Sequence, residues 1–594
     1  MIVGILIMRS RMGPFVCPLS AVAILATAQA GAQLFNFTDV SVEAGVDVTH
    51  VSGESPFLVF MSAGGAAADF DRDGWVDLFV LGGGGIADRL FINNRDGTFS
   101  DRAEEWGVAI AQHSFGASAA DYDGDGWIDL YVTSYGPGDQ SPAPMQHKLF
   151  RNNGPNSEGQ CTFTDSAQAA GVQMLLHEGF INGTGSGWGD IDLDGDLDLT
   201  VCAYNHNRAG NRVYINNNDG TFTDSTALLG LEFNHVQGFL PGWIDFNGDR
   251  YPEYMLIGDT GSSRYYVNNG PDSQGLLSFT EIEEVGDAFN NAMGLAVGDV
   301  NNDGRLDMYV SGSYYPSFDG PGNQLMVQQP DGSFVDVATE PGVLNGGWAW
   351  GVLIVDLDHD GLSDVLSTNG FIPQWVGEQT YLWKNMGGLV FEEDAIASGL
   401  ENISMGRGAI HLDYDNDGDQ DIVIFASAGP TSLYRNDLIT AGEPTPAGAA
   451  WLRVDLDTSA RDRLAPQGIG SLVTVSSAEG SWIDSVDNAV SHCATGQVGA
   501  HFGLGDAEVL DWVRIRWNDG SFTTLVDVPA NQILEIAPPF SPADTDASGA
   551  LDIDDVLAYL TAFSDDSLTA DQDGDGVLGF SDVLRYIHWF MQDS

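Results

Sequence analysis

One nine-residue acidic pattern recurs along this chain and constrains its fold more than any other feature. In the first copy, Asp69, Asp71, Asp73 and Asp77 occupy positions 1, 3, 5 and 9, and Gly74 occupies position 6. Four carboxylates this close together repel one another, so a compact loop needs a counter-ion. Alternating oxygen ligands around a glycine turn match the coordination that Ca²⁺ prefers. A single copy could equally be a solvated acidic turn, so the argument depends on repetition.

The pattern returns six more times, and a period of this length is typical of a propeller, solenoid or array. Its first residues are 52, 69, 55, 54, 57 and 57 positions apart. The fourth copy departs from the pattern, with Arg250 in place of the glycine. The further expected calcium ligands are Asp121, Asp123, Asp125 and Asp129; Asp190, Asp192, Asp194 and Asp198; Asp245, Asn247, Asp249 and Glu253; Asp299, Asn301, Asp303 and Asp307; Asp356, Asp358, Asp360 and Asp364; and Asp413, Asp415, Asp417 and Asp421.

Each acidic loop lies within a unit of four short predicted strands. In the first unit, a small-residue strand at 61–68 precedes the loop, and apolar strands at 75–81, 89–94 and 98–101 follow it. An Asp-Gly turn between alternating runs is a strong hairpin signal. Four such strands are the content of one β-propeller blade. We therefore expect a mainly β chain with one blade per acidic loop.

Small residues recur at two fixed places before each loop, which predicts an inner strand packed near a crowded centre. Seven residues before the first Asp are Ser62, Ser114, Gly183, Gly238, Ala292, Ala349 and Gly406. Five residues before it are Gly64, Gly116, Gly185, Leu240, Gly294, Gly351 and Gly408.

The two ends of the repeat region predict that the ring closes. Residues 35–39 resemble the outer strand at 161–165, but no inner strands precede them, and the unit ending at 432–436 lacks its outer strand. We expect the N-terminal strand to complete the seventh blade and so to cover an exposed sheet edge.

A candidate ligand site lies where the inner strands begin. Eight residues before the loops are Met61, His113, Asn182, Gln237, Asn291, Trp348 and Met405. We expect His113, Asn182, Gln237, Asn291 and Trp348 to line a channel mouth suited to a polar or sugar ligand. The alternative is that part of this ring is packing.

Charge and the N-terminus restrict the partners and the compartment. The formal net charge is −63, which argues against nucleic acid or an anionic membrane as partners. Residues 1–32 carry Arg9 and Arg11, an apolar run and small-residue cleavage sites, as expected of a secretory signal peptide, with Met8 and Met12 as alternative starts. We expect no transmembrane segment and a secreted protein. A bridge between Cys161 and Cys202 is possible in that compartment.

The repeats at 33–438 resemble the FG-GAP/VCBS family, whose calcium-loop repeats also occur in integrin α chains. The resemblance implies a seven-bladed propeller that binds calcium. After a linker at 439–449, residues 450–537 resemble an ASPIC/UnbV domain through Ala500–Gly505 and Trp517–Gly520. His501 within this match is a structural residue or a site residue.

After a second linker at 538–543, residues 544–594 contain two twelve-residue acidic loops, each followed by apolar residues at helical spacing. This segment resembles a type I dockerin, with a small helical double EF-hand-like fold. The resemblance implies two more calcium sites and a cohesin-type partner on a scaffold or cell surface. The expected ligands are Asp544, Asp546, Ser548, Asp552 and Asp555, then Asp571, Asp573, Asp575 and Asp582.

These features favour an extracellular binding or adhesion module over an enzyme. The sequence shows no nucleophile elbow or zinc-protease motif, and no catalytic residue is predicted. Two alternatives remain open. One is a carbohydrate-active enzyme, a polysaccharide lyase or hydrolase carried by its dockerin; the other is a rigid spacer.

Overall fold

The computed structural model describes most of the chain beyond the leader. The described residues are 36–51, 58–137, 146–173, 180–204, 210–231, 233, 235–314, 320–371, 377–461, 463–487, 490–539, 543–545, 553–564, 567–572, 574 and 577–593. All statements below refer to these residues, so the predicted leader lies outside them.

Strands β1–β29 form seven sheets built on four strands each. In six of them the four strands are consecutive, the seventh combines β27–β29 with β1, and a fifth strand, β10, extends one sheet. The sheets are β2 (Gly65–Ala68), β3 (Asp77–Val80), β4 (Arg89–Asn93), β5 (Phe99–Asp101); β6 (Ser114–Ala120), β7 (Asp129–Pro137), β8 (Lys148–Pro155), β9 (Cys161–Asp165), with β10 (Phe180–Asn182); β11 (Ser186–Gly189), β12 (Asp198–Val201), β13 (Arg212–Asn216), β14 (Phe222–Asp224); β15 (Gln237–Ile244), β16 (Glu253–Asp259), β17 (Arg264–Pro271), β18 (Leu277–Glu281); β19 (Leu295–Gly298), β20 (Asp307–Val310), β21 (Gln324–Gln328), β22 (Phe334–Asp336); β23 (Ala349–Val355), β24 (Asp364–Asn369), β25 (Tyr381–Asn385), β26 (Phe391–Glu393); and β27 (Gly406–Leu412), β28 (Asp421–Ala426), β29 (Ser432–Asn436) with β1 (Phe37–Asp39). Short helices connect them: α1 (Ser41–Ala44), η1 (Leu58–Met61), α2 (Ala103–Trp106), α3 (Ala167–Ala170) and α4 (Glu283–Ala288).

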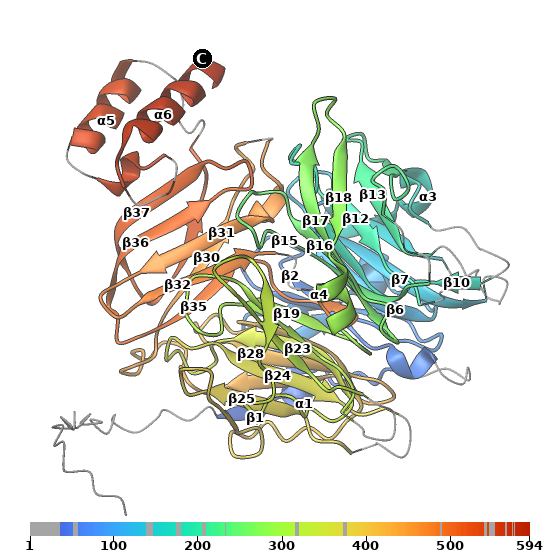
Figure 1. The fold of residues 1–594 in the computed structure, drawn as a ribbon. Helices are drawn as coiled ribbons and strands as arrows, with labels where there is room; N and C mark the ends of the chain where they lie inside the picture. The colour runs from blue at the N-terminus through green and yellow to red at the C-terminus, as the bar shows by residue number, and fades with distance from the viewer. Residues whose placement is uncertain are drawn as a thin grey trace, which may run out of the picture. The chain divides into compact units, whose positions relative to one another are not determined.

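The N-terminal strand completes the last sheet, as predicted. β1 pairs antiparallel with β29, and Phe37 lies opposite Asn436. The outer edge of β29 is therefore covered by residues from the other end of the repeat region. The repeated four-stranded sheets and this closure are consistent with a β-propeller (Figure 1).

Glycines at or beside the first strands pack so closely against their neighbours that a β-carbon does not fit, which confirms the expected crowded centre. A β-carbon on Gly116 would come within 2.5 Å of the Thr184 carbonyl oxygen, just before β11. The same atom on Gly294 would come within 2.1 Å of the Trp350 carbonyl oxygen. Leu240, the exception to the small-residue rule, is fully buried in one core cluster with Leu295.

A ring of side-chain amides joins each sheet to the acidic loop of the preceding one. In each case the amide at the end of the third strand donates to the carbonyl of loop position 2. The pairs are Asn152 to Phe70 (2.9 Å), Asn216 to Tyr122 (2.9 Å), Asn268 to Ile191 (3.1 Å), Gln328 to Phe246 (2.8 Å), Asn385 to Val300 (2.9 Å), Asn436 to Leu357 (2.9 Å) and Asn93 to Tyr414 (2.8 Å). The last pair joins the first sheet to the loop of the seventh.

Replacing one of these amides should destabilise the ring. The change Asn152→Ala leaves the buried Phe70 carbonyl without its 2.9 Å donor, at an expected cost of about 1–3 kcal/mol. Urea unfolding measures the effect. Asn153→Ala is the matched control, because the amide of Asn153 bonds at an exposed position and its loss should cost under about 1 kcal/mol. Equal stabilities of the two variants would contradict the role of Asn152.

The C-terminal segment forms two further sheets around their own core. One is β35 (Ala500–Gly505), β30 (Ala450–Leu456) and β38 (Gln532–Ile536); the other is β32 (Ser481–Val486), β31 (Ser471–Ser476), β36 (Val509–Arg516) and β37 (Phe522–Pro529), with the short helix η4 (Pro466–Gly468). Buried Leu452, Val473, Phe502 and Trp517 belong to the core that the two sheets share.

A loop of this segment reaches the centre of the seven sheets, which the sequence did not indicate. The short strands β33 (Val490–Ser491) and β34 (Ala494–Thr495) form it, and β34 pairs with the inner strand β2. The ring nitrogens of His492 lie 2.8 Å from the Met293 carbonyl oxygen and 2.9 Å from that of Met61. We call residues 490–496 the central plug, because they fill the space among the inner strands.

The chain ends in two helices, α5 (Ile553–Ser564) and α6 (Phe580–Asp593), joined by way of η5 (Leu568–Ala570). The rings of Tyr559 and Tyr586 stack between them, with centroids 4.0 Å apart. The spacing of apolar residues within 544–594 predicts helices there, and the structure has helices at these two elements (Figure 1). No helix in the described part of the chain is long and apolar enough to cross a membrane.

Candidate metal centres

Two backbone positions give the acidic loops their shape. Position 6 has a left-handed φ of +85° at Gly74 and +86° at Gly126, which explains the recurring glycine. Position 4 is also left-handed, with φ of +57° at Arg72 and +60° at Leu193, and sequence reasoning missed this requirement. In the fourth loop Arg250 takes φ of +84° at position 6, so the strained conformation is retained there without glycine.

Backbone amides hold the first and last carboxylates of each loop in place. In the first loop, Asp69 accepts bonds from the backbone nitrogens of Asp73 at 2.9 Å and Gly74 at 2.7 Å. Asp77 accepts from the nitrogens of Phe70 at 3.0 Å and Asn93 at 2.8 Å. The loop is therefore fixed before any ion enters it.

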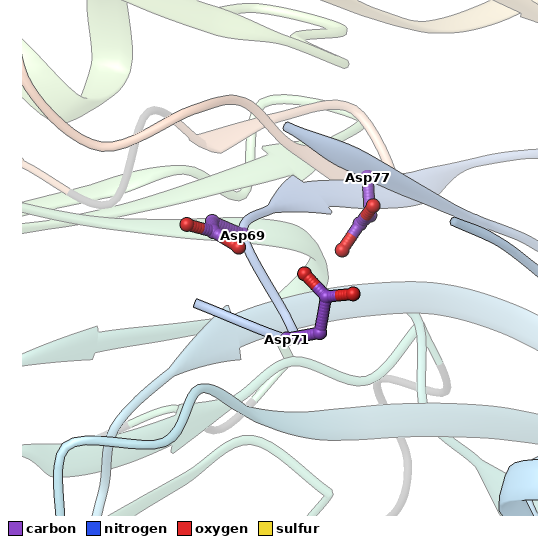
Figure 2. A group of neighbouring side chains, drawn as sticks. All are labelled: Asp69, Asp71 and Asp77. Carbon is purple, nitrogen blue, oxygen red and sulfur yellow. The ribbon is translucent and has the colours of Figure 1, made fainter. Parts of the chain in front are cut away.

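The carboxylates predicted as ligands converge, and one oxygen at the centre lacks a partner. Asp69, Asp71 and Asp77 each place an oxygen within 4.8 Å of the others, and Figure 2 shows these three side chains. The same holds for Asp121, Asp123 and Asp129; Asp190, Asp192 and Asp194; Asp356, Asp358 and Asp360; and Asp413, Asp415 and Asp421. In all five groups the position-3 Oδ1 is buried without a hydrogen-bond partner: Asp71, Asp123, Asp192, Asp358 and Asp415.

An unpartnered buried carboxylate oxygen is costly unless a cation binds it. The five clusters therefore fit a hard divalent cation with oxygen ligands, which is consistent with the calcium expected in these loops. The fifth predicted loop offers Asp299, Asp303 and Asp307 with Asn301 at position 3.

Burial and mutual repulsion raise the pKa values of the loop carboxylates. Burial, together with the neighbouring Asp73 and Asp69, raises the pKa of Asp71 to about 6. Burial likewise raises the pKa of Asp121 to about 7 and that of Asp307 to about 7. Without a cation these groups hold protons near neutral pH; a bound ion would displace them.

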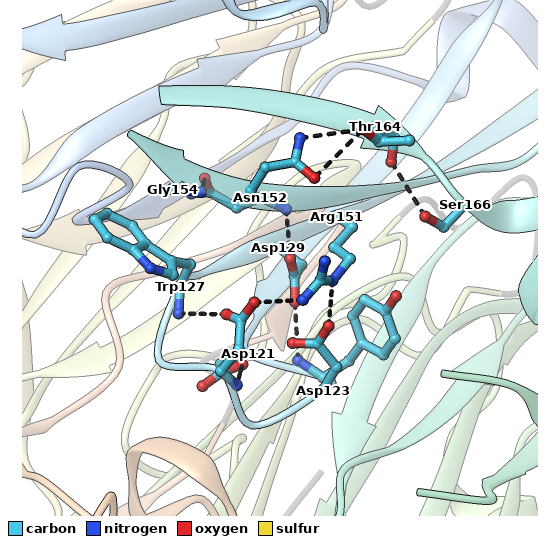
Figure 3. Close-up of polar contacts among 12 residues, drawn as sticks. Asp121, Asp123, Trp127, Asp129, Arg151, Asn152, Gly154, Thr164 and Ser166 are labelled. Atoms are coloured by element: carbon cyan, nitrogen blue, oxygen red, sulfur yellow. Dashed lines mark hydrogen bonds and ion pairs between the residues drawn. The ribbon is translucent and has the colours of Figure 1, made fainter. Parts of the chain in front are cut away.

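Four loops pair with a side-chain cation from outside the loop: Arg95 in the first and Arg151 in the second are more than a third exposed, whereas the cations of the fourth and sixth loops are largely buried. In the fourth loop, Arg516 Nη2 lies 2.7 Å from Asp245 Oδ2, and Asn247 donates to Glu253 at 2.6 Å. In the sixth loop, the ammonium of Lys384 contacts Asp358 and lies 3.8 Å from Asp360, with both Lys384 and Asp358 buried. By contrast, Arg151 reaches the second loop from a position 39% exposed, pairing with Asp123 and Asp125 (Figure 3).

The structure places the predicted ligand ring around the central plug. Met61 is buried, and its carbonyl oxygen lies 2.9 Å from Nε2 of His492. His113, Gln237, Asn291, Trp348 and Met405 are half-buried, and the side chain of Asn182 lies outside the described residues. Gln237 accepts from Thr260 at 2.5 Å, and the backbone nitrogen of Trp348 donates to Glu378 at 3.1 Å. Part of the predicted ligand ring is therefore engaged in contacts within the protein, as the packing alternative expected.

The cysteines remain reduced. Cys161 and Cys202 are both free and buried, so the possible bridge between them is not formed. Cys493 at the tip of the central plug is also free and buried.

His501 has a structural place between the C-terminal sheets and the acidic loops. His411 Nδ1 lies 2.7 Å from Gln420 Oε1, Gln420 Nε2 lies 3.4 Å from His501 Nδ1, and His501 Nε2 lies 3.1 Å from His359 Nε2. His359 Nδ1 in turn lies 3.2 Å from the Ala449 carbonyl oxygen. All of these hydrogen bonds can form with neutral imidazole rings if each group in the series donates to the next. His501 therefore links the sixth and seventh acidic loops to the C-terminal sheets.

The acidic loops at 544–594 are described only in part. Asp546, Ser548, Asp552, Asp573 and Asp575 lie outside the described residues. Asp544, Asp555, Asp571 and Asp582 are buried. Asp571 pairs with Arg514 at 3.0 Å, and Asp582 accepts from the backbone nitrogens of Gln572 and Gly579, both at 2.7 Å.

Comparison with known proteins supports two parts of the sequence interpretation. The FG-GAP-like repeat model matches residues 69–132 and 245–310. The ASPIC and UnbV model matches residues 462–542. The chain contains both kinds of unit. These matches confirm the FG-GAP and ASPIC/UnbV resemblances at those residues.

Curated relatives span most of the chain. Cartilage acidic protein 1 of Mus musculus is 23% identical over 514 residues, covering 81% of this chain and 74% of the relative. The Homo sapiens protein of that name is 23% identical over 511 residues, covering 81% and 72%. A solved structure of a protein from Lactobacillus plantarum aligns with a TM-score of 0.32 and 14% identity, covering 55% of this chain and 82% of that one.

Proposed function

We propose that this protein is a secreted, calcium-stabilised seven-bladed β-propeller that serves as an extracellular binding or adhesion module. The observation that carries the proposal is the ring of amide bonds that links every sheet to an acidic loop and returns from Asn93 to the Tyr414 carbonyl at 2.8 Å. A rigid ring held by its loops presents fixed loop ends to a partner. The relatives named for cartilage and the leader-like residues 1–32 support a location outside the cell.

The binding face in this proposal is the end of the ring that carries His113, Asn182, Gln237, Asn291 and Trp348. The central plug blocks passage through the ring, so a ligand would bind across this end. Half-buried indole and amide groups suit a polar or sugar ligand.

A screen of the full chain against arrays of polysaccharides and extracellular proteins tests this function. Retention that weakens in the triple variant His113→Ala, Gln237→Ala, Trp348→Ala supports binding at the ring. Turnover of a glycan would instead support the enzyme alternative, and no retention by any ligand would favour the spacer.

The number of bound calcium ions is expected to be lower than the number of acidic loops, because a largely buried arginine or lysine side chain pairs with the carboxylates of two loops. We propose that the first, second, third, fifth and seventh loops bind calcium, while Arg516 and Lys384 replace it in the fourth and sixth. The variant Lys384→Ala should therefore bind one more Ca²⁺ per chain than the wild type, measured by native mass spectrometry. Lys148→Ala is the matched control, because Lys148 pairs with Asp165 outside the loops. An equal count in wild type and Lys384→Ala would contradict the replacement.

The helical pair supports attachment to a cohesin-type module. The basis for this part of the proposal is the resemblance of the two acidic loops to dockerin calcium loops, together with an exposed apolar surface on α5 and α6. The large exposed side chains of this surface are Ile553, Leu557, Leu560, Phe580, Leu584, Ile587 and Met591. Binding of the full chain to a panel of immobilised cohesin modules tests it, with Leu584→Asp as the variant expected to lose binding. Absence of binding to every cohesin would remove this attachment but leave the propeller proposal intact.

A further inference from the structure

A groove of about 730 Å³ lies where the fourth acidic loop, the sheet of β31, β36 and β37, and helix α6 meet. We call it the arginine groove. It is lined by Arg250, Trp512, Arg514, Arg516, Arg585 and Trp589, among others. The whole chain has 22 lysines and arginines against 85 aspartates and glutamates, so four arginines in one groove are a marked local enrichment.

Pairing leaves the arginine groove with an excess of positive charge. Arg516 pairs with Asp245 at 2.7 Å and Arg514 pairs with Asp571 at 3.0 Å. The lining residue Asp519 is neutralised from outside the groove by Arg461 at 2.7 Å. Of the lining carboxylates in the described part of the chain, that of Asp249 then remains to face Arg250 and Arg585, so the described lining residues carry an excess of positive charge.

The two unpaired guanidinium groups keep donors available for a ligand. Arg250 uses Nη1 on the Asp519 carbonyl oxygen at 2.6 Å. Arg585 uses Nη1 on the carbonyl oxygens of Gly520 at 3.3 Å and Gln572 at 3.4 Å. These bonds orient each planar group and leave Nε and Nη2 of both without an acceptor in the described part of the chain. Two adjacent guanidinium donors match the two oxygens of a carboxylate or sulfate group.

Aromatic rings line the same groove. The Arg514 guanidinium lies 5.2 Å from the ring centroid of Trp512, which holds the indole in place. Trp589 Nε1 is buried and has no hydrogen-bond partner among the residues described, so it is a donor that lacks an acceptor. A pyranose ring packs its C–H face on an indole while its substituents reach polar groups at the rim.

We propose that the arginine groove binds an anionic saccharide, a sugar carrying a carboxylate or sulfate group. The charged group would lie between Arg250 and Arg585, and the sugar ring would lie against Trp512, within reach of Trp589 Nε1. This site goes beyond the binding function proposed above, because its residues belong to the C-terminal sheets, α6 and the fourth loop.

Binding of the full chain to polygalacturonate, heparin and neutral dextran at fixed calcium concentration tests the proposal. Binding to polygalacturonate alone assigns a carboxylate ligand, and binding to heparin alone assigns a sulfate ligand. We expect Arg250→Gln with Arg585→Gln, and separately Trp512→Ala, to raise the Kd by about tenfold or more. Arg102→Gln, which removes an exposed arginine paired with Glu105, should change it by less than about twofold. Raising the salt concentration should weaken binding.

Three results would overturn the proposal: no binding to either polyanion, unchanged binding in both groove variants, or equally strong binding to polyglutamate, which would assign an acidic peptide instead. Melting curves establish that each variant is folded, and Arg585→Gln alone serves if the double variant is not. Trp348→Ala separates the two proposals. If it abolishes saccharide binding and the groove variants do not, the groove is excluded while the ring remains the binding site.

Discussion

Removing calcium with EGTA at pH 7.5 and low salt is expected to lower the melting temperature of this protein by about 10 °C or more. Of the five loops proposed to bind calcium, the first, second, third and seventh bring carboxylates together around a buried oxygen that has no hydrogen-bond partner in the described part of the chain, as at Asp71 and Asp123. Each ion bound only to the folded state at a hundred times its Kd adds about 2.7 kcal/mol of stability. Differential scanning calorimetry with and without chelator measures the shift, and added calcium should restore it.

The effect of calcium should grow with pH. In the metal-free chain, burial raises the pKa of Asp121 and that of Asp307 to about 7, above the values of the unfolded chain near 4. The folded state then binds more protons than the unfolded state between about pH 4 and 7, so metal-free stability falls as pH rises through that range. Calcium competes with these protons, so it binds better at higher pH. A melting temperature that EGTA leaves unchanged from pH 5 to 8 would contradict metal binding in the loops.

The second large effect is expected from Gly64→Ala, which should displace the central plug. A β-carbon at Gly64 would lie 1.9 Å from the carbonyl oxygen of Cys493. Neither the backbone at Gly64 nor that at Cys493 can move away easily, because β34 pairs with β2 and a ring nitrogen of His492 lies 2.9 Å from the Met61 carbonyl oxygen. Overpacking of this kind costs roughly 1–3 kcal/mol or more. We therefore expect either a large loss of stability or release of residues 490–496.

Thiol labelling distinguishes these outcomes. Cys161, Cys202 and Cys493 are all buried in the wild type, so none should react with a thiol reagent under native conditions. In Gly64→Ala, peptide mapping should show Cys493 labelled while Cys161 and Cys202 stay protected. Gly579→Ala is the matched control, because the nearest atom to its β-carbon would be 3.6 Å away. If Cys493 stays protected and stability is unchanged, the contact between Gly64 and the plug is not tight.

The repeat pattern allowed much of this fold to be predicted, because the same turn, packing and ligand residues recur at the same places in successive units. The glycine at position 6, the small residue at Gly116 and the carboxylates of the first loop follow from turn geometry, close packing and metal chemistry. The amide of Asn93 also recurs in register, in an Asn-Asn pair after each apolar strand of several units. Its role was not predicted because the acceptor belongs to a neighbouring sheet, 321 residues away.

The features that the sequence did not reveal depend on single contacts between distant residues. Arg516 pairs with Asp245 across 271 residues, and nothing in either local pattern indicates it. Lys384 occupies a place in the third strands that varies between units, with Ile92 or Val267 in some and Arg151 or Arg435 in others. The central plug has neither a periodic pattern nor a charge signal, so only its packing among the inner strands identifies it.

The central plug also bears on the order in which the chain can fold as it is synthesised. His492 contacts Met61 across 431 positions, and β34 pairs with a strand of the first sheet. The first sheet is therefore made well before the residues that complete its inner edge, since Ala66 pairs with Thr495, 429 positions later in the chain. A nascent chain stopped before residue 490 would carry all seven sheets with an open centre, exposing Phe115, Phe239 and Trp350. Such a chain would depend on assistance against aggregation until its C-terminal segment arrived.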